Sequence, residues 1–148
     1  RAEAAVKEPT LAPSSAPTAH PTSAPTPVPT PSRCMTLSVN STSLEALGAQ
    51  RSRMGLYDRL SFAHSRFGRP SFQLRTTNAH AATTYLYFES AGTKKFWLIG
   101  PTLGKESGGM LVVDVAASPE FIRGKWLAWS AQKKWVHVPV LIILCVNQ

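Results

Sequence analysis

The sequence of 148 residues predicts a small all-β domain, a β-sandwich or barrel of about eight short strands, preceded by an extended polyproline II-like tail. Eight of the 12 prolines fall in residues 1–33, which contain no aromatic residue and cannot build a hydrophobic core. Residues 34–148 hold all 13 aromatic residues, in short apolar runs separated by turn residues. We therefore expect a tail over residues 1–33 and one domain over residues 34–148.

The tail is built on a tetrapeptide repeat. Proline recurs at every fourth residue from Pro9 to Pro29, and Thr or Ser follows it in each unit. Proline fixes φ and biases the preceding residue toward extended geometry, so the repeat favours polyproline II over α-helix. Segments rich in Ser, Thr and Pro are typical of O-glycosylated stalks, and an unmodified flexible linker is the alternative.

The Pro-Thr and Pro-Ser units of residues 9–32 resemble the hydroxyproline-rich glycoproteins of algal and plant cell walls. In that family, prolines are hydroxylated and carry sugars, and so do neighbouring hydroxyl residues. The resemblance implies O-glycosylation or hydroxylation at Pro9, Thr10, Pro13, Ser14, Pro17, Thr18, Pro21, Thr22, Pro25, Thr26, Pro27, Pro29, Thr30, Pro31 and Ser32.

Eight apolar runs, bounded by turn signals such as Gly68-Arg69-Pro70, Gly100-Pro101 and Gly108-Gly109, are the expected strands of the domain. They lie, in chain order, at Met35–Val39, Met54–Phe62, Pro70–Leu74, Thr83–Phe88, Phe96–Ile99, Met110–Val115, Lys125–Ser130 and Trp135–Val146.

Two segments are expected outside the strands. Ser43–Gln50 predicts a helix of at most about two turns, because Ser43 can cap it and the leucines that follow share a face. Ser118–Ile122 predicts another short turn. The longest apolar run, Val138–Val146, is too short to span a membrane and suits a buried strand.

The two cysteines, Cys34 and Cys145, bracket the domain. A disulfide between them would place the first and last strands side by side, and two buried free thiols are the alternative. Zinc would need more ligands, and the four histidines show no ligand spacing. The disulfide predicts a secreted, extracellular protein. In that compartment the sequon Asn40-Ser41-Thr42 predicts N-glycosylation at Asn40.

The domain also resembles a small secreted β module of algal and oomycete surface proteins. The matching features include Gly55-Leu56-Tyr57, Tyr85-Leu86-Tyr87-Phe88, Trp97-Leu98-Ile99-Gly100-Pro101 and Gly124-Lys125-Trp126. The resemblance implies an extracellular display or adhesion unit without a known chemistry.

The net charge is +8, and six arginines fall within residues 51–75, opposed there only by Asp58. A basic surface attracts nucleic acid, anionic lipid or acidic polysaccharide, and a solvated surface without a partner is the alternative. The secretory features argue against nucleic acid.

The four tryptophans, Trp97, Trp126, Trp129 and Trp135, are possible sugar-stacking residues, with core packing as the alternative. Trp126 and Trp129 are three residues apart, so we expect them on opposite faces of a strand. No acidic pair, nucleophile motif or phosphate-binding glycine loop is recognisable, and we expect neither catalysis nor a cofactor or metal site.

These features predict a structural subunit of an extracellular glycosylated fibre or coat, with copies of itself, covalent glycans and an acidic polysaccharide as partners. A carbohydrate-binding or adhesion module on a glycosylated stalk is the alternative. Residues 1–8 contain the tail's least proline-restricted stretch, so Ala4, Ala5 and Val6 are the expected assembly strand, which would add to a neighbouring sheet edge.

The tail modification is directly testable. We expect the peptide between Lys7 and Arg33 to exceed its unmodified mass by the masses of hydroxyl groups and sugars, because the repeat presents Pro and Thr or Ser in every unit. Mass spectrometry of protein from the native source checks this. A peptide at its unmodified mass contradicts the prediction.

Overall fold

The computed structural model describes residues 33–147, and the predicted tail sites and assembly strand lie outside them. Nine strands form one antiparallel sheet. The strands are β1 (Thr36–Asn40), β2 (Gly55–Arg59), β3 (Phe72–Leu74), β4 (Tyr85–Ala91), β5 (Lys94–Gly100), β6 (Met110–Val113), β7 (Leu127–Trp129), β8 (Trp135–His137) and β9 (Ile142–Asn147).

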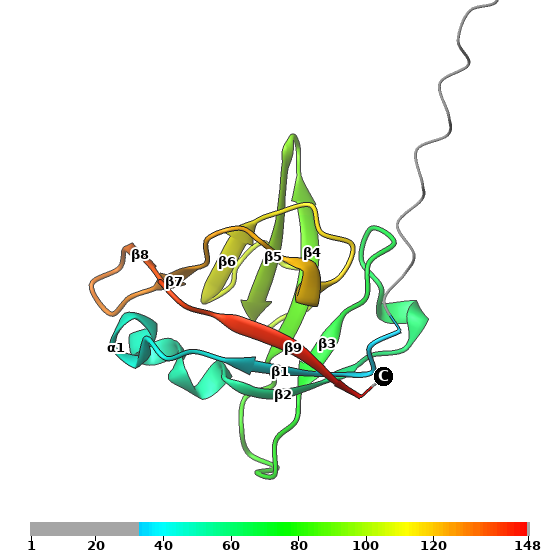
Figure 1. Cartoon of the computed structure of the whole chain (residues 1–148), viewed down its shortest axis with the longest axis horizontal. Coiled ribbons are helices and arrows are strands. Elements are labelled where there is room, and N and C mark those ends of the chain that lie inside the picture. The colour runs from blue at the N-terminus through cyan, green and yellow to red at the C-terminus, as the bar shows by residue number, and fades with distance from the viewer. Residues whose placement is uncertain (1–32, 148) are drawn as a thin grey trace, which may run out of the picture.

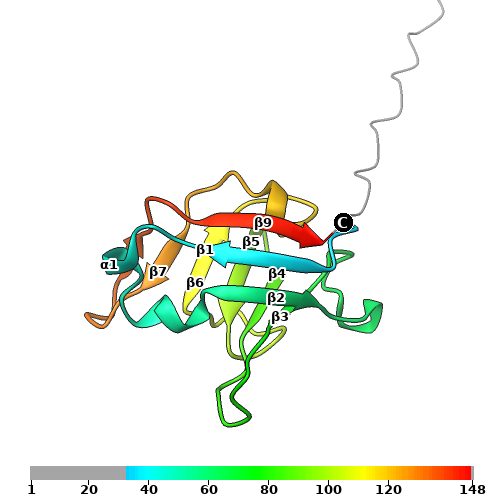
Figure 2. The ribbon, with the colours of Figure 1, turned by 60° about the horizontal axis from the view of Figure 1, so that its bottom comes forward.

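The sheet order is β8-β7-β6-β5-β4-β3-β2-β1-β9. Strands β1 to β8 therefore follow one another as a meander, and β9 crosses back to pair with β1. The sheet curls so that β9, β1 and β2 lie across from β5 and β6, which gives a half-barrel (Figures 1 and 2). The all-β prediction is confirmed, in the form of one curled sheet of nine strands.

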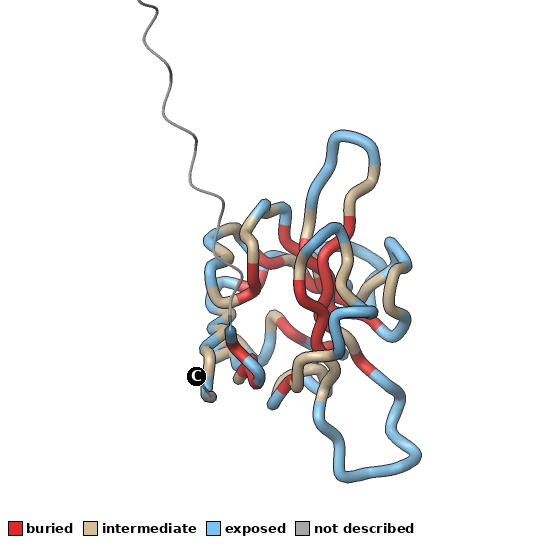
Figure 3. The backbone as a smooth tube through the Cα atoms, turned by 90° about the vertical axis from the view of Figure 1, so that its right-hand side faces the viewer, coloured by how far each residue is buried: buried red, intermediate tan, exposed pale blue. Residues whose placement is uncertain are grey.

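The buried residues of the strands form one hydrophobic core inside the curl, and in Figure 3 the buried stretches of backbone lie in the interior while the loops are exposed. Leu37, Tyr57, Phe72 and Trp97 are fully buried there, and the Phe88 and Trp97 rings meet edge to face at 5.5 Å. Residues 86–89 of β4 and residues 97–100 of β5 are buried on both faces. On the convex side the loop over residues 101–109 covers these strands, since the Tyr87 hydroxyl donates to the Lys105 carbonyl there.

Short helices occupy the connections. The predicted helix over Ser43–Gln50 forms as α1 (Leu44–Leu47) and continues as the 3₁₀ helix η1 (Gly48–Arg53). The α-helix changes to a 3₁₀ helix at Gly48, whose φ of 50° costs glycine little conformational energy. The remaining 3₁₀ helices are η2 (Phe62–His64) and η3 (Pro119–Phe121).

Two strand predictions were wrong in extent. The predicted strand Met54–Phe62 ends at Arg59, and Trp135–Val146 is two strands, β8 and β9. The interruption contains Pro139, which has no N–H to donate to a ladder.

The expectation that Val138–Val146 forms a buried strand was also wrong. Ile142, Leu144 and Val146 point outward and are 42%, 59% and 47% exposed. Burial fails on this face because the side chains of β9 alternate, and it is Ile143 and Cys145 that pack against the core.

Cys34 and Cys145 form a disulfide that spans 111 residues of sequence. It ties the segment before β1 to the end of β9, and the two strands pair antiparallel. The predicted disulfide and the predicted adjacency of the first and last strands are both confirmed.

We expect the double variant Cys34→Ala with Cys145→Ala to lose about 4–5 kcal/mol of unfolding free energy, because a very long loop is then open in the unfolded state. Urea denaturation measures the loss. Wild-type protein in reductant is the matched control, since it opens the loop and keeps both sulfur atoms. A loss below about 1 kcal/mol in both cases would show that β1 and β9 stay paired without the crosslink.

Candidate functional site

The arginines of the basic stretch are largely used within the fold. Arg66 forms a 3.0 Å ion pair with Glu89, and Arg75 forms a 2.6 Å ion pair with Asp58. The Arg69 guanidinium lies 3.8 Å from the Phe88 ring centroid and donates to the carbonyls of Val115 and Ala116. These contacts tie loops to the sheet, so a large part of the positive charge has a structural role.

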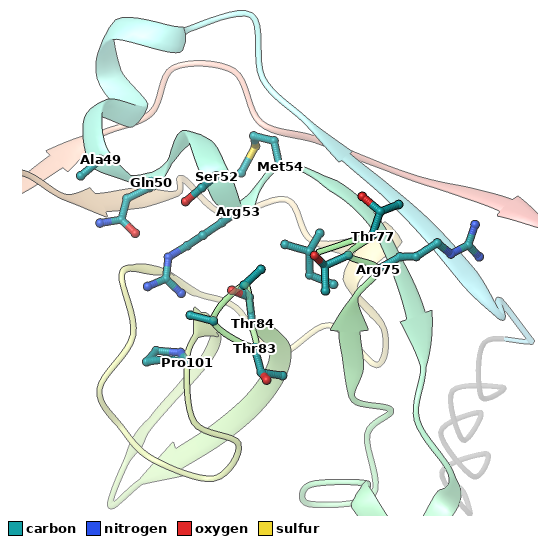
Figure 4. A pocket seen from close by; sticks show the side chains of 14 residues that line it. Ala49, Gln50, Ser52, Arg53, Met54, Arg75, Thr77, Thr83, Thr84 and Pro101 are labelled. Carbon is teal, nitrogen blue, oxygen red and sulfur yellow. The ribbon is translucent and has the colours of Figure 1, made fainter. Parts of the chain in front are cut away.

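A cavity of about 630 Å³ lies between η1 and the connection from β3 to β4 (Figure 4). Its wall combines hydroxyls, small apolar groups and two arginines, and none of the residues that line it is acidic. They are Ala49, Gln50, Ser52, Arg53, Met54, Leu74, Arg75, Thr76, Thr77, Ala81, Ala82, Thr83, Thr84 and Pro101.

Arg53 points from the end of η1 into this cavity, toward the segments that carry Thr84 and Pro101 (Figure 4). Its Nη1 atom is buried and has no hydrogen-bond acceptor within residues 33–147. Oε1 of the neighbouring Gln50 is also buried and has no hydrogen-bond donor within this range. A buried polar atom without a partner is costly, and a buried charged one more so. The fold leaves both atoms without a partner, and both belong to residues that line the cavity.

The surroundings of Arg53 are neutral at physiological pH. Burial lowers the pKa of the Arg53 guanidinium, and the titratable groups that act on it are the tyrosines Tyr57 and Tyr87. Burial raises the pKa of Tyr57 above its usual range, and burial together with the Glu89 charge raises the pKa of Tyr87 to about 12. Both phenols are therefore uncharged and leave the cation uncompensated.

The wall that carries Arg53 is fixed to the sheet at several points. The Tyr57 hydroxyl donates to the Arg53 carbonyl at 2.6 Å, and Gln50 Nε2 donates to the Trp129 carbonyl at 3.0 Å. Gly109 allows the close approach, because a Cβ there would overlap Gln50 Oε1 and lie 2.9 Å from Arg53 Nε. A preformed wall of this kind loses little entropy when a ligand binds.

The second feature is an apolar stripe on the outside of β9, which we define as Ile142, Leu144 and Val146. β9 is hydrogen-bonded to a strand on one side only, β1, and η3 is the element nearest its other side. β8, the other terminal strand, is only three residues long, whereas β9 has six. The longer terminal strand is the stronger template for an added strand.

The tryptophans divide into two pairs. Trp97 and Trp126 are buried, with 0% and 4% of their surface exposed, and belong to the core. Trp129 and Trp135 are each 39% exposed and face each other across β7 and β8, with ring centroids 5.2 Å apart at 67°. Trp126 precedes β7 and is buried, whereas Trp129 at the end of β7 is partly exposed, so only the pair Trp129 and Trp135 is available for sugar stacking.

The remaining predicted sites lie apart from the cavity. Asn40 is exposed at the end of β1, where the sequon is accessible. Within residues 33–147, no cluster of His, Cys, Asp and Glu is suited to hold a metal ion. The helices of this same range are all too short to span a membrane.

No protein-family model matches the chain, and neither a curated protein nor a solved structure matches it. The function of the chain must therefore be inferred from its own residues.

The buried tyrosines predict alkaline instability. Because Tyr87 loses its proton near pH 12 when folded and near pH 10 when unfolded, the unfolded state binds fewer protons between these values and stability falls there. Tyr57 acts in the same direction. We expect tyrosinate absorbance to rise together with unfolding in an alkaline titration. In Tyr87→Phe the pH dependence should be weaker, and an unchanged dependence would contradict the assignment.

Proposed function

We propose that this protein is a structural subunit of an extracellular glycosylated fibre or coat, in which the tail of one subunit docks on β9 of the next. The observation that carries the proposal is the apolar stripe on a terminal strand of six residues. A terminal strand is the part of a sheet to which an incoming extended segment is added.

The docking segment is residues 1–8, where Ala4, Ala5 and Val6 are apolar and can pair without interruption. In the polyproline II geometry that the repeat predicts, residues 9–32 would extend about 75 Å, at about 3.1 Å per residue. β9 is only about 20 Å long. A spacer of that length favours docking on a different subunit over docking on its own.

Such a contact joins two different surfaces, so it repeats in one direction. A heterologous contact gives an open filament unless its rotation closes a ring. The sugars expected on the repeat would cover the spacer between domains and keep it extended. The disulfide and the exposed sequon at Asn40 support an extracellular setting.

A carbohydrate-binding or adhesion role is the second candidate. It is favoured by the half-exposed pair Trp129 and Trp135, since exposed aromatic faces stack on sugar rings. The edge-to-face packing of this pair leaves less open ring area than a flat platform would.

The fibre proposal predicts that deletion of residues 1–8 leaves a folded monomer that does not polymerise. Negative-stain microscopy and sedimentation measure filament length and mass. Filaments of normal repeat from the truncated protein would show that domain–domain contacts hold the fibre.

The edge itself has a matched pair of variants. Leu144→Lys places a charge on the stripe and should abolish filaments, whereas Val113→Lys, at a 67% exposed position of β6, should leave them intact. Equal effects of the two substitutions would exclude β9 as the docking strand.

A further inference from the structure

We propose that the cavity between η1 and the β3–β4 connection binds an acidic saccharide, with Arg53 holding a carboxylate or sulfate group and the surrounding hydroxyls holding the sugar. This site is separate from the fibre contact and does not depend on it, because none of the residues that line the cavity belongs to β9 or β1.

The charge of the lining selects an anion. Of the two arginines in the cavity wall, Arg75 already has a carboxylate partner, Asp58, whose pKa the Arg75 hydrogen bond lowers. Arg53 has no carboxylate partner within the described chain, and its Nη1 is buried without an acceptor. An oxyanion is the group that satisfies a guanidinium best, since it accepts two parallel N–H bonds.

The neutral part of the lining indicates a sugar. Five residues of the lining carry hydroxyls, and Gln50 carries an amide; the hydroxyl residues are Ser52, Thr76, Thr77, Thr83 and Thr84. Met54, Leu74, Pro101 and the alanines supply apolar surface for the C–H faces of a ring. A volume of about 630 Å³ lies in the range of small-molecule sites and is far larger than a single inorganic anion.

A second, smaller cavity of about 310 Å³ has Leu74, Arg75 and Thr76 in common with the first and is otherwise lined by Asp58, Arg59, Leu60 and Gln73. Arg75 is paired with Asp58 there, so Arg53 remains the anion ligand on which the proposal depends.

The test measures binding of two probes, an oligogalacturonate and a dextran sulfate oligosaccharide, to the full-length protein by calorimetry. Neutral dextran of equal length and inorganic sulfate are the ligand controls. Arg53→Gln removes the proposed anion ligand. Lys95→Gln removes an equal charge from an exposed position at the opposite end of β5 from Pro101 and is the matched control.

We expect one or both acidic probes to bind, and to bind at least ten-fold more weakly to Arg53→Gln than to wild type or Lys95→Gln. Binding to the carboxylated probe alone or to the sulfated probe alone identifies the anionic group. Four results would overturn the proposal: no binding, equal loss in both variants, inorganic sulfate or neutral dextran binding as tightly as the probes, or preferential binding of a DNA oligonucleotide.

The thermal unfolding midpoint, measured without ligand, distinguishes a structural role of Arg53 from a role in binding. Because the substitution removes a half-buried cation without a carboxylate partner, Arg53→Gln should unfold no more than a few degrees below wild type. If the variant does not fold, nitrogen-15 NMR of the wild-type protein decides. The Arg53 Nε–H and Gln50 side-chain signals must shift during the probe titration, and unshifted signals reject the site.

Discussion

The pairing of the last strand with the first, held by the disulfide between Cys34 and Cys145, is the constraint on which the rest of the structure depends. A meander of eight strands could close on itself at β8 and leave no edge. Here β9 instead makes its one strand pairing with β1 and becomes an end of the sheet. The open half-barrel (Figure 2), the exposed side chains of the apolar stripe and the position of Cys34 beside the end of β9 all follow from that pairing.

The cavity depends on a different set of contacts, made by η1. This short helix has little stability of its own, because it contains glycine and three exposed or half-exposed polar residues. The bonds from Tyr57 to the Arg53 carbonyl and from Gln50 to the Trp129 carbonyl fix it against β2 and β7. The opposite wall, the connection from β3 to β4, is exposed over residues 75–83. One wall is therefore fixed to the sheet, and the other is exposed to solvent.

The sequence was sufficient for the features that depend on local chemistry. Apolar runs and glycine turns located the strands, and the position of the cysteines at the two borders of the domain predicted their bond. Features that depend on the path of the sheet could not be predicted from the sequence. The residues of Ile142–Asn147 could not show that one face of this strand would have no packed neighbour. The six arginines of residues 51–75 look alike in the sequence, so Arg53 could not be distinguished from Arg69. Arg69 contacts two carbonyls and an aromatic ring that lie more than 15 positions away in the sequence, whereas Arg53 Nη1 has no acceptor among residues 33–147.

The two proposed sites are compatible on one molecule. In the sheet, β1 and β2 separate β9 from β3, so a tail docked on the apolar stripe would leave the cavity beside β3 and β4 open. A filament built by head-to-tail contacts would then display one cavity per subunit along its length. A polyanionic saccharide that spans several subunits would bind through several weak sites at once, and its avidity would exceed the affinity of any single cavity by orders of magnitude. Weak binding by the isolated domain is therefore compatible with firm retention by the fibre.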